Sequence, residues 1–325
     1  MAAKSAGAGM TTELVTIPNG RWPLHGVLHR PAHTAQRRVG VLIVQESYNT
    51  KFGPHRIFVR LGEALSQGGF HALRYDNRGT CDSEGFLDIT FEDRLADSET
   101  ALAYFRESCQ LEAVIVWGLC MGATVAAHLT RGRRTGIDGL VLCSILADPR
   151  DASLPQLGYA NVDVGEFLKD SWRRGDWWGK VRRVGQRFSH YRRVLGRLAV
   201  VWVRAHVSPK SELARLRAAI QQVGRLLARY EGPCLLIFGE KDETLAHFQE
   251  RVNPGDRLGL ARKPRPPDVV IIGEGDHTFA SREQMTELLR VTLDWLTPLQ
   301  HGRRPAMVNR DRGVGHGVSA APVAE

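Results

Sequence analysis

The amino-acid sequence predicts an α/β fold, a doubly wound and mostly parallel sheet with an inserted helical lid. Short apolar runs alternate with segments of helical spacing, and this alternation stops between residues 147 and 230 before it resumes. Strands that alternate with helices favour parallel pairing, because each helix returns the chain to the same end of the sheet. At 325 residues the chain is long enough for one large domain with such an insertion.

Eight apolar runs are the predicted strands. They span residues 14–17, 24–28, 39–44, 70–75, 113–117, 140–145, 234–238 and 269–272. The first two flank Pro18-Asn19-Gly20 and predict a hairpin, since Asn-Gly is a preferred turn sequence. Residues 39–44 form a continuous apolar run, which is typical of a strand covered on both faces. Helical spacing is found at residues 57–65, 91–105, 123–129 and 285–296.

These elements divide the chain. Residues 11–146 and 231–299 are expected to form the two parts of the core, and residues 147–230 the lid. The lid would lie over the carboxyl ends of the strands, where ligands bind in such sheets. Residues 1–10 and the Gly-, Arg- and Pro-rich residues 300–325 lack periodicity, so we expect both ends to be disordered.

Composition indicates a globular cytoplasmic protein. Hydrophobic residues make up 43% of the chain and the mean hydropathy is −0.24. No apolar run approaches the ~20 residues of a membrane span, and the first ten residues lack the apolar core of a signal peptide. Five scattered cysteines do not suggest a disulfide framework. Neither C-x-x-C nor H-E-x-x-H is present, so we expect no metal and no cofactor.

Positive charge is concentrated in the predicted lid. The whole chain carries +9, whereas residues 171–230 alone hold 15 lysines and arginines against two acidic residues. One basic segment argues against a nucleic-acid binder and favours a local partner surface. Six arginines are interleaved with apolar residues at helical spacing: Arg182, Arg183, Arg187, Arg192, Arg193 and Arg197. Such a helix can hold the protein peripherally on an anionic inner-membrane face. Alternatively, its apolar face packs on the core and its arginines are solvated.

The pentapeptide Gly118-Leu119-Cys120-Met121-Gly122 connects a predicted strand to a predicted helix. Strand, G-x-nucleophile-x-G and helix in this order form a nucleophile elbow, here with cysteine as the nucleophile. Small residues are needed on both sides because the turn is crowded. The helix N-terminus favours a thiolate and, later, an oxyanion.

A cysteine nucleophile needs a base, and the base needs an orienting acid. Asp242 follows the strand at 234–238 and is the favoured acid, with Glu240 and Glu243 as rivals on the same loop. His277 follows the last strand and is the predicted base. The chain order nucleophile, acid, histidine is the one this elbow requires.

The loop after residues 39–44 is predicted to complete the oxyanion hole. The donors of the oxyanion hole would be two backbone N–H groups, that of Met121 after the nucleophile and that of Ser47 on this loop. Glu46 precedes Ser47, and an acid so close to a thiol can keep the thiol neutral until substrate arrives. Alternatively, Glu46 forms an ion pair with Lys51 or Arg56.

With these residues, the chain resembles α/β-hydrolases from residue 11 to residue 299. The cysteine elbow and Gln45-Glu46 are similar to dienelactone hydrolases. That resemblance implies a Cys-Asp-His triad with a glutamate near the thiol, and so roles for Cys120, Asp242, His277 and Glu46.

A second resemblance lies between Gly53 and Gly85. The stretch Asp76-Asn77-Arg78-Gly79-Thr80-Cys81-Asp82-Ser83 looks like the lidded serine aminopeptidase and lysophospholipase-like hydrolases. Within that group it is closest to hydrolases associated with exosortase A systems, bacterial systems that handle exported, surface-anchored proteins and extracellular polysaccharide. Cys81 breaks the D-x-R-G-x-G-x-S pattern where glycine is usual.

The expected function is hydrolysis of an ester or thioester through an acyl-cysteine, with a small-molecule or lipid acyl substrate. Two alternatives remain. The same triad could transfer the acyl group to an alcohol or amine. A non-catalytic relic could instead bind a lipid or a partner, although a relic need not keep all three triad residues.

Overall fold

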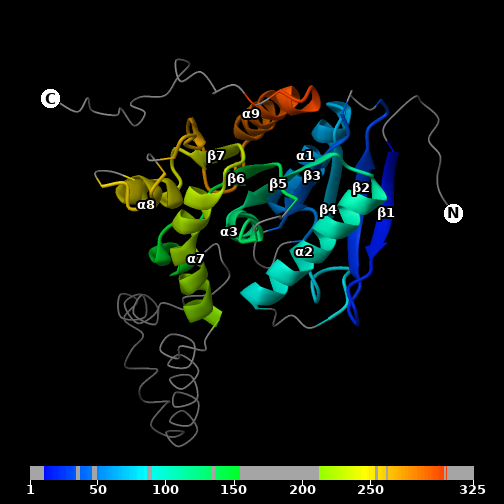
Figure 1. Ribbon diagram of the computed structural model, residues 1–325, viewed down its shortest axis with the longest axis horizontal. Helices are drawn as coiled ribbons and strands as arrows, with labels where there is room; N and C mark the ends of the chain where they lie inside the picture. Colours follow the sequence, from blue (N-terminus) through cyan, green and yellow to red (C-terminus); the bar gives the residue numbers. More distant parts are fainter. Residues whose placement is uncertain are drawn as a thin grey trace, which may run out of the picture.

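In the computed structural model, the described residues are 11–33, 37–45, 50–85, 90–132, 136–153, 212–252, 255–260, 263–303 and 305. Eight strands form one sheet in the order β1-β2-β4-β3-β5-β6-β7-β8 (Figure 1). Their bounds are β1 (Thr11–Ile17), β2 (Leu24–Arg30), β3 (Val39–Val44), β4 (His71–Tyr75), β5 (Ala113–Leu119), β6 (Gly139–Cys143), β7 (Cys234–Gly239) and β8 (Asp268–Ile272). β2 pairs antiparallel with both β1 and β4, and all other neighbours are parallel.

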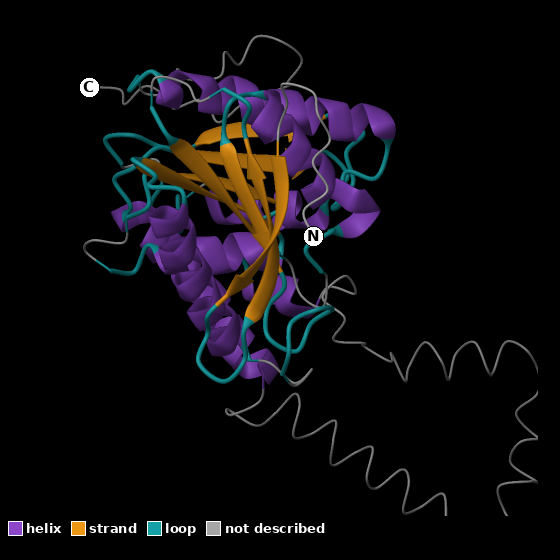
Figure 2. Ribbon diagram, turned by 90° about the vertical axis from the view of Figure 1, so that its right-hand side faces the viewer, coloured by secondary structure: helices purple, strands orange, loops and turns teal. Residues whose placement is uncertain are grey.

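Helices cover both faces of this sheet (Figure 2). The described helices are α1 (Ile57–Gln67), α2 (Phe91–Ser108), α3 (Met121–Leu129), α7 (Glu212–Arg229), α8 (Glu243–Val252) and α9 (Arg282–Gln300). α1 packs against α9, whereas α3 packs against α2 and α7. Short 3-10 turns lie at Pro54–Arg56 and Pro149–Ser153. Within the described part, no helix is both long enough and apolar enough to cross a membrane.

The predicted α/β fold is confirmed, including the hairpin of β1 and β2. β3 has the predicted bounds and is buried at every position, as expected of a strand covered on both faces. β5 runs two residues beyond its predicted end, because the pairing with β6 continues to Leu119 and Cys143. The sequence analysis did not predict α8, which begins directly after Asp242.

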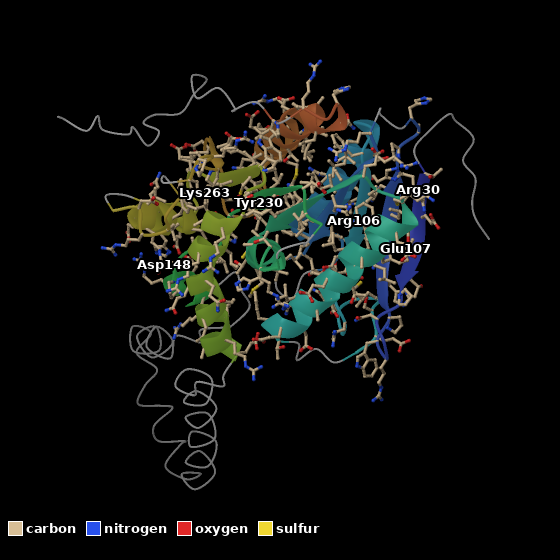
Figure 3. All side chains as sticks on the ribbon, in the orientation of Figure 1. Arg30, Arg106, Glu107, Asp148, Tyr230 and Lys263 are labelled. Carbon is tan, nitrogen blue, oxygen red and sulfur yellow. The ribbon has the colours of Figure 1, made fainter. Side chains whose placement is uncertain are left out.

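The expected lid is described only at its two ends. α7 buries Leu216, Ile220 and Val223, and its Ala219 carbonyl lies 2.9 Å from Nε2 of His128 in α3. At the end of α7, the Lys263 ammonium donates hydrogen bonds to two backbone carbonyls, one of them that of Tyr230 (Figure 3). α7 is therefore part of the helical layer that covers the sheet. Residues 154–211, the six interleaved arginines among them, lie outside the described residues, as do 1–10 and 306–325.

Six parallel strands end at the same edge of the sheet. They are consecutive in the sheet order: β4, β3, β5, β6, β7 and β8. Residues that follow these strands in the sequence are therefore brought together, although the chain separates them widely.

Candidate active site

Cys120 lies in a sharp turn between β5 and α3. Its backbone has φ 55° and ψ −119°, a conformation that non-glycine residues rarely adopt. The Cys120 N–H donates a hydrogen bond of 2.9 Å to the Cys143 carbonyl at the end of β6. A side chain at Gly118 would place Cβ 2.5 Å from the Gly122 backbone, and one at Gly122 would place it 2.3 Å from the Val44 carbonyl oxygen. Only glycine fits on either side, so the structure forms the elbow that the motif predicts.

Asp242 and His277 lie at the ends of the two strands beyond β6. Nδ1 of His277 is 2.9 Å from Oδ1 of Asp242, and the side chains are 7% and 1% exposed. The other ring nitrogen, Nε2, is buried and has no nitrogen or oxygen partner among the described residues. The Cys120 thiol acts electrostatically on this ring. The structure therefore brings together the three residues that the sequence analysis selected.

Opposing effects set the charge of this group. Burial by itself would lower the pKa of the His277 imidazole. The charge of Cys120 and the hydrogen bond to Asp242 outweigh burial, so the pKa lies well above 6.5. Burial would likewise raise the pKa of the Asp242 carboxyl, but the hydrogen bond and charge of His277 lower it. An imidazolium stabilised in this way favours a neighbouring thiolate.

Backbone contacts lock the acid loop to the histidine loop. The Lys241 N–H donates to the Gly275 carbonyl at 2.8 Å, and the Glu240 N–H donates to the Ile272 carbonyl at 3.0 Å. A Cβ at Gly239 would lie 2.4 Å from the Gly275 carbonyl oxygen, so the close approach requires glycine there. The two loops therefore hold the acid and the base as one unit.

The two rival carboxylates have other positions. Glu240 is exposed, and its Oε2 accepts the Glu274 N–H at 2.8 Å. Glu243 is exposed in the first turn of α8, where the helix dipole stabilises a negative charge. Of the three candidates, Asp242 is the carboxylate that contacts His277.

Met121 is the first residue of α3 and is buried, at the position expected of an oxyanion donor. Glu46 and Ser47 lie outside the described residues. The Lys51 ammonium, one of the two partners considered for Glu46, pairs with Asp76 and Asp82.

The ligand atoms of Asp76, Cys81 and Asp82 lie within 4.8 Å of one another, a spacing that could hold a metal ion. The Lys51 ammonium contacts both carboxylates of this group and so already balances their charge. Cys81 has φ 48°, in the left-handed region that favours glycine. That conformation explains why glycine is usual at this position of the motif.

The sequence analysis missed two buried polar residues that follow β6 in the chain, Ser144 and Asp151. Ser144 directly follows β6, is fully buried, and donates its hydroxyl to the His277 carbonyl at 3.1 Å. Asp151 is also fully buried and pairs with His247 of α8. The Asp148 carboxylate, close to α8 in Figure 3, accepts a hydrogen bond of 2.9 Å from Nε of Arg150. A polar residue immediately after an apolar strand was the available signal for Ser144.

A comparison with known families shows which family the chain belongs to. The serine aminopeptidase S33 family of hydrolases (Hydrolase_4) matches residues 55–253. The chain belongs to this family. The family is named for serine enzymes, whereas the elbow of this S33-family hydrolase carries Cys120. No curated protein sequence matches it.

Solved structures of other α/β-hydrolases share the fold. Est1E from Butyrivibrio proteoclasticus, solved with ferulic acid, is 16% identical, with 89% of this chain and 100% of that chain covered and a TM-score of 0.59. An esterase from Pyrococcus furiosus is 15% identical, with coverage of 88% and 90% and a TM-score of 0.56. Dienelactone hydrolase from Anabaena variabilis is 14% identical, with coverage of 89% and 97% and a TM-score of 0.53. At these identities the similarity concerns the fold alone.

Proposed function

We propose that this S33-family protein is a cysteine hydrolase that cleaves a carboxylic ester or thioester through an acyl-cysteine intermediate. Cys120 is the nucleophile, His277 the general base and Asp242 the residue that orients the base. The observation that carries the proposal is the contact between Asp242 and His277, 2.9 Å apart, beside a cysteine in the strained conformation of an elbow.

The reaction proceeds in two halves. The Cys120 thiolate attacks the acyl carbon, and the oxyanion collapses with loss of the alcohol or thiol, which takes its proton from the His277 imidazolium. Neutral His277 then removes a proton from water as the water attacks the acyl-cysteine. The second oxyanion collapses, the C–S bond breaks and the acid is released, which restores the Cys120 thiolate beside the His277 imidazolium. Buried Asp242 remains ionised throughout, because its lowered pKa keeps the carboxylate charged beside the imidazolium.

The backbone N–H of Met121, with that of Ser47, is proposed to bind the oxyanion. Glu46 is proposed to adjust the reactivity of the thiol. A Glu46→Gln variant should shift the pH at which Cys120 reacts with iodoacetamide. An unchanged alkylation profile would leave Glu46 as an ordinary loop carboxylate.

The test is a panel of p-nitrophenyl esters and acyl-pantetheine thioesters of increasing chain length, with an aminoacyl p-nitroanilide as the peptidase probe. Cys120→Ala should lose about 10³-fold or more in kcat, because the triad acts as a unit. Rapid quenching followed by mass spectrometry should locate the acyl group on Cys120. Cys81→Ser is the matched control, since Cys81 is the exposed free cysteine of the described part. Full activity of Cys120→Ala, or an acyl group on another residue, would contradict the proposal.

Burial of the site favours acyl transfer as a second candidate. Cys120 is 1% exposed and His277 is 7% exposed, and a site that excludes water lets another acceptor compete for the acyl group. Adding alcohols and amines to the same assay separates the two reactions by their products. Acyl-enzyme that forms without turnover until an acceptor is added would identify a transferase. The absence of both product and acyl-enzyme would favour a non-catalytic binding protein.

The exosortase-associated placement and the membrane surface remain proposals from the sequence. Sedimentation with anionic liposomes tests the second one. Binding that weakens with salt, and that is lost on charge reversal at Arg182, Arg183 and Arg187, is the expected result. Wild-type protein that stays in the supernatant at low salt would leave the arginines as solvated residues.

A further inference from the structure

Two consecutive residues, Cys143 at the end of β6 and Ser144 directly after it, contact the proposed nucleophile and the proposed base. The Cys143 carbonyl accepts the Cys120 N–H at 2.9 Å. The next residue, Ser144, donates its hydroxyl to the His277 carbonyl at 3.1 Å. Nucleophile and base therefore meet at one corner of the backbone.

Ser144 itself is strained and deeply buried. Its φ of 48° lies in the left-handed region, and none of its surface is exposed. The Ser144 N–H donates to the Ile237 carbonyl of β7 at 2.8 Å, so the strained backbone is tied to the strand that leads to Asp242. Packing alone would favour glycine at such a position. A serine there retains a hydroxyl at the cost of strain, and strain of this kind collects at functional sites.

We propose that Ser144 is a positioning residue that holds His277 and Asp242 in register with Cys120. This inference rests on the proposed function, because the geometry that it maintains is that of the triad. The hydroxyl holds the histidine loop at the His277 carbonyl, and the Lys241 N–H holds the same loop at the Gly275 carbonyl. Without the hydroxyl, the imidazole is less well aligned and the imidazolium is less stabilised.

The test compares Ser144→Gly and Ser144→Ala with Ser66→Ala. Glycine removes the hydroxyl and relieves the left-handed strain, whereas alanine removes the hydroxyl and keeps the strain. Ser66, in α1, is the matched control. Its buried hydroxyl also donates to a backbone carbonyl, that of Arg30, at 3.3 Å. The measurements are kcat and KM on a p-nitrophenyl ester, the pH profile of Cys120 alkylation by iodoacetamide, and the urea midpoint.

Both Ser144 variants should lower kcat about tenfold, which corresponds to one lost hydrogen bond, with KM changed less than about twofold. Their alkylation profiles should shift to higher pH, because a weaker imidazolium supports the thiolate less. Ser144→Gly should keep or raise the urea midpoint while it loses turnover, a combination that a purely structural role would not produce. Ser66→Ala should leave kcat and alkylation unchanged.

The outcomes separate this inference from the proposed function. Suppose that the wild-type protein turns over the ester and that Ser144→Gly has the same kcat and the same alkylation profile. The positioning role is then overturned, and the proposed hydrolase function stands. An alkylation shift in a protein that turns over none of the acyl substrates supports the positioning role and overturns the hydrolase. An equal loss of kcat in Ser66→Ala would show that any lost buried hydroxyl has the same effect, and would also overturn the inference.

Discussion

At the residue scale, Cys81 shows what a departure from a motif does to the backbone. It occupies the place of a glycine and keeps the glycine conformation, with φ 48°. Its thiol lies 3.9 Å from the Lys51 ammonium, within the group formed with Asp76 and Asp82. The two acidic residues and the lysine hold the turn, so the strained cysteine is tolerated. Because the triad residues lie on other loops, the substitution leaves the proposed chemistry untouched.

Cys81→Gly should therefore stabilise the protein by up to about 1 kcal/mol. Glycine relieves the left-handed strain of the folded state, and this gain exceeds the cost of the larger conformational entropy that glycine gives the unfolded chain. Cys81→Val should destabilise by about 1–2 kcal/mol, since a β-branched residue is less compatible with positive φ. Urea unfolding measures both. A Gly variant less stable than wild type would mean that the thiol contributes more than its conformation costs.

At the element scale, capping boxes fix the N-terminal ends of two helices, α2 and α9. α2 begins with a capping box between Thr90 and Asp93, and α9 with one between Ser281 and Gln284. In α9, the Ser281 hydroxyl accepts the Gln284 N–H at 3.2 Å, and the Gln284 side chain returns to the Ser281 N–H at 3.4 Å. The Gln284 amide also donates to the Glu274 carbonyl at 2.8 Å. The cap of α9 thus supports the loop that carries His277.

Ser281→Ala should cost about 1 kcal/mol of unfolding free energy, because it leaves an N-terminal amide of α9 without its acceptor. Thr286→Ala, at an exposed position in the second turn of the same helix, should be neutral or slightly stabilising because alanine is the better helix former. Chemical unfolding of the two variants is the measurement. Equal effects of the two substitutions would show that the cap contributes nothing measurable.

At the scale of the whole molecule, three buried histidines make the fold sensitive to acid. Burial, and then the charge of Arg74, lowers the pKa of His29 to about 4. Burial also lowers the pKa of His71 and of His128. A lowered histidine pKa means that the unfolded chain binds more protons below pH ~6.5. Stability from these residues is complete above that pH and is lost as the pH falls.

The free energy of unfolding should therefore decrease between pH 6.5 and pH 4, and His29 alone should account for about 3 kcal/mol at pH 4. His277 has the opposite sign: its raised pKa gives stability that is complete below pH ~6.5 and is lost as the pH rises through the folded value. Carboxylates with lowered pKa values, such as Asp242, lose their contribution only below their usual range. Burial raises the pKa of the Asp151 and Glu212 carboxyls, which therefore offset part of this loss as the pH falls, so the comparison of wild type with a His29 variant isolates the contribution of the histidine.

Denaturant unfolding at several pH values measures this dependence. His29→Gln should flatten the acid side of the curve, because glutamine keeps an acceptor for the Arg74 guanidinium, which lies 3.0 Å from Nε2 of His29, and binds no proton. His301→Gln, at an exposed position after α9, is the control and should follow the wild-type curve. A wild-type slope in His29→Gln would refute the assignment.

The sequence by itself determined the strands, the elbow and the loops that carry Asp242 and His277. These are local signals. A continuous apolar run such as β3 is typical of a strand covered on both faces. Glycine is required at position 118 because a Cβ there would lie 2.5 Å from the backbone of Gly122 in the same segment.

Only the tertiary structure decided which carboxylate of the acid loop contacts His277, because Asp242, Glu240 and Glu243 share that loop and differ only in direction. It also placed Ser144 against His277, across 133 positions of the chain, and paired Lys51 with Asp76. Such contacts depend on the order and register of β6, β7 and β8 in the sheet. No pattern within a single segment specifies that order, because it is set by how all the strands pack together.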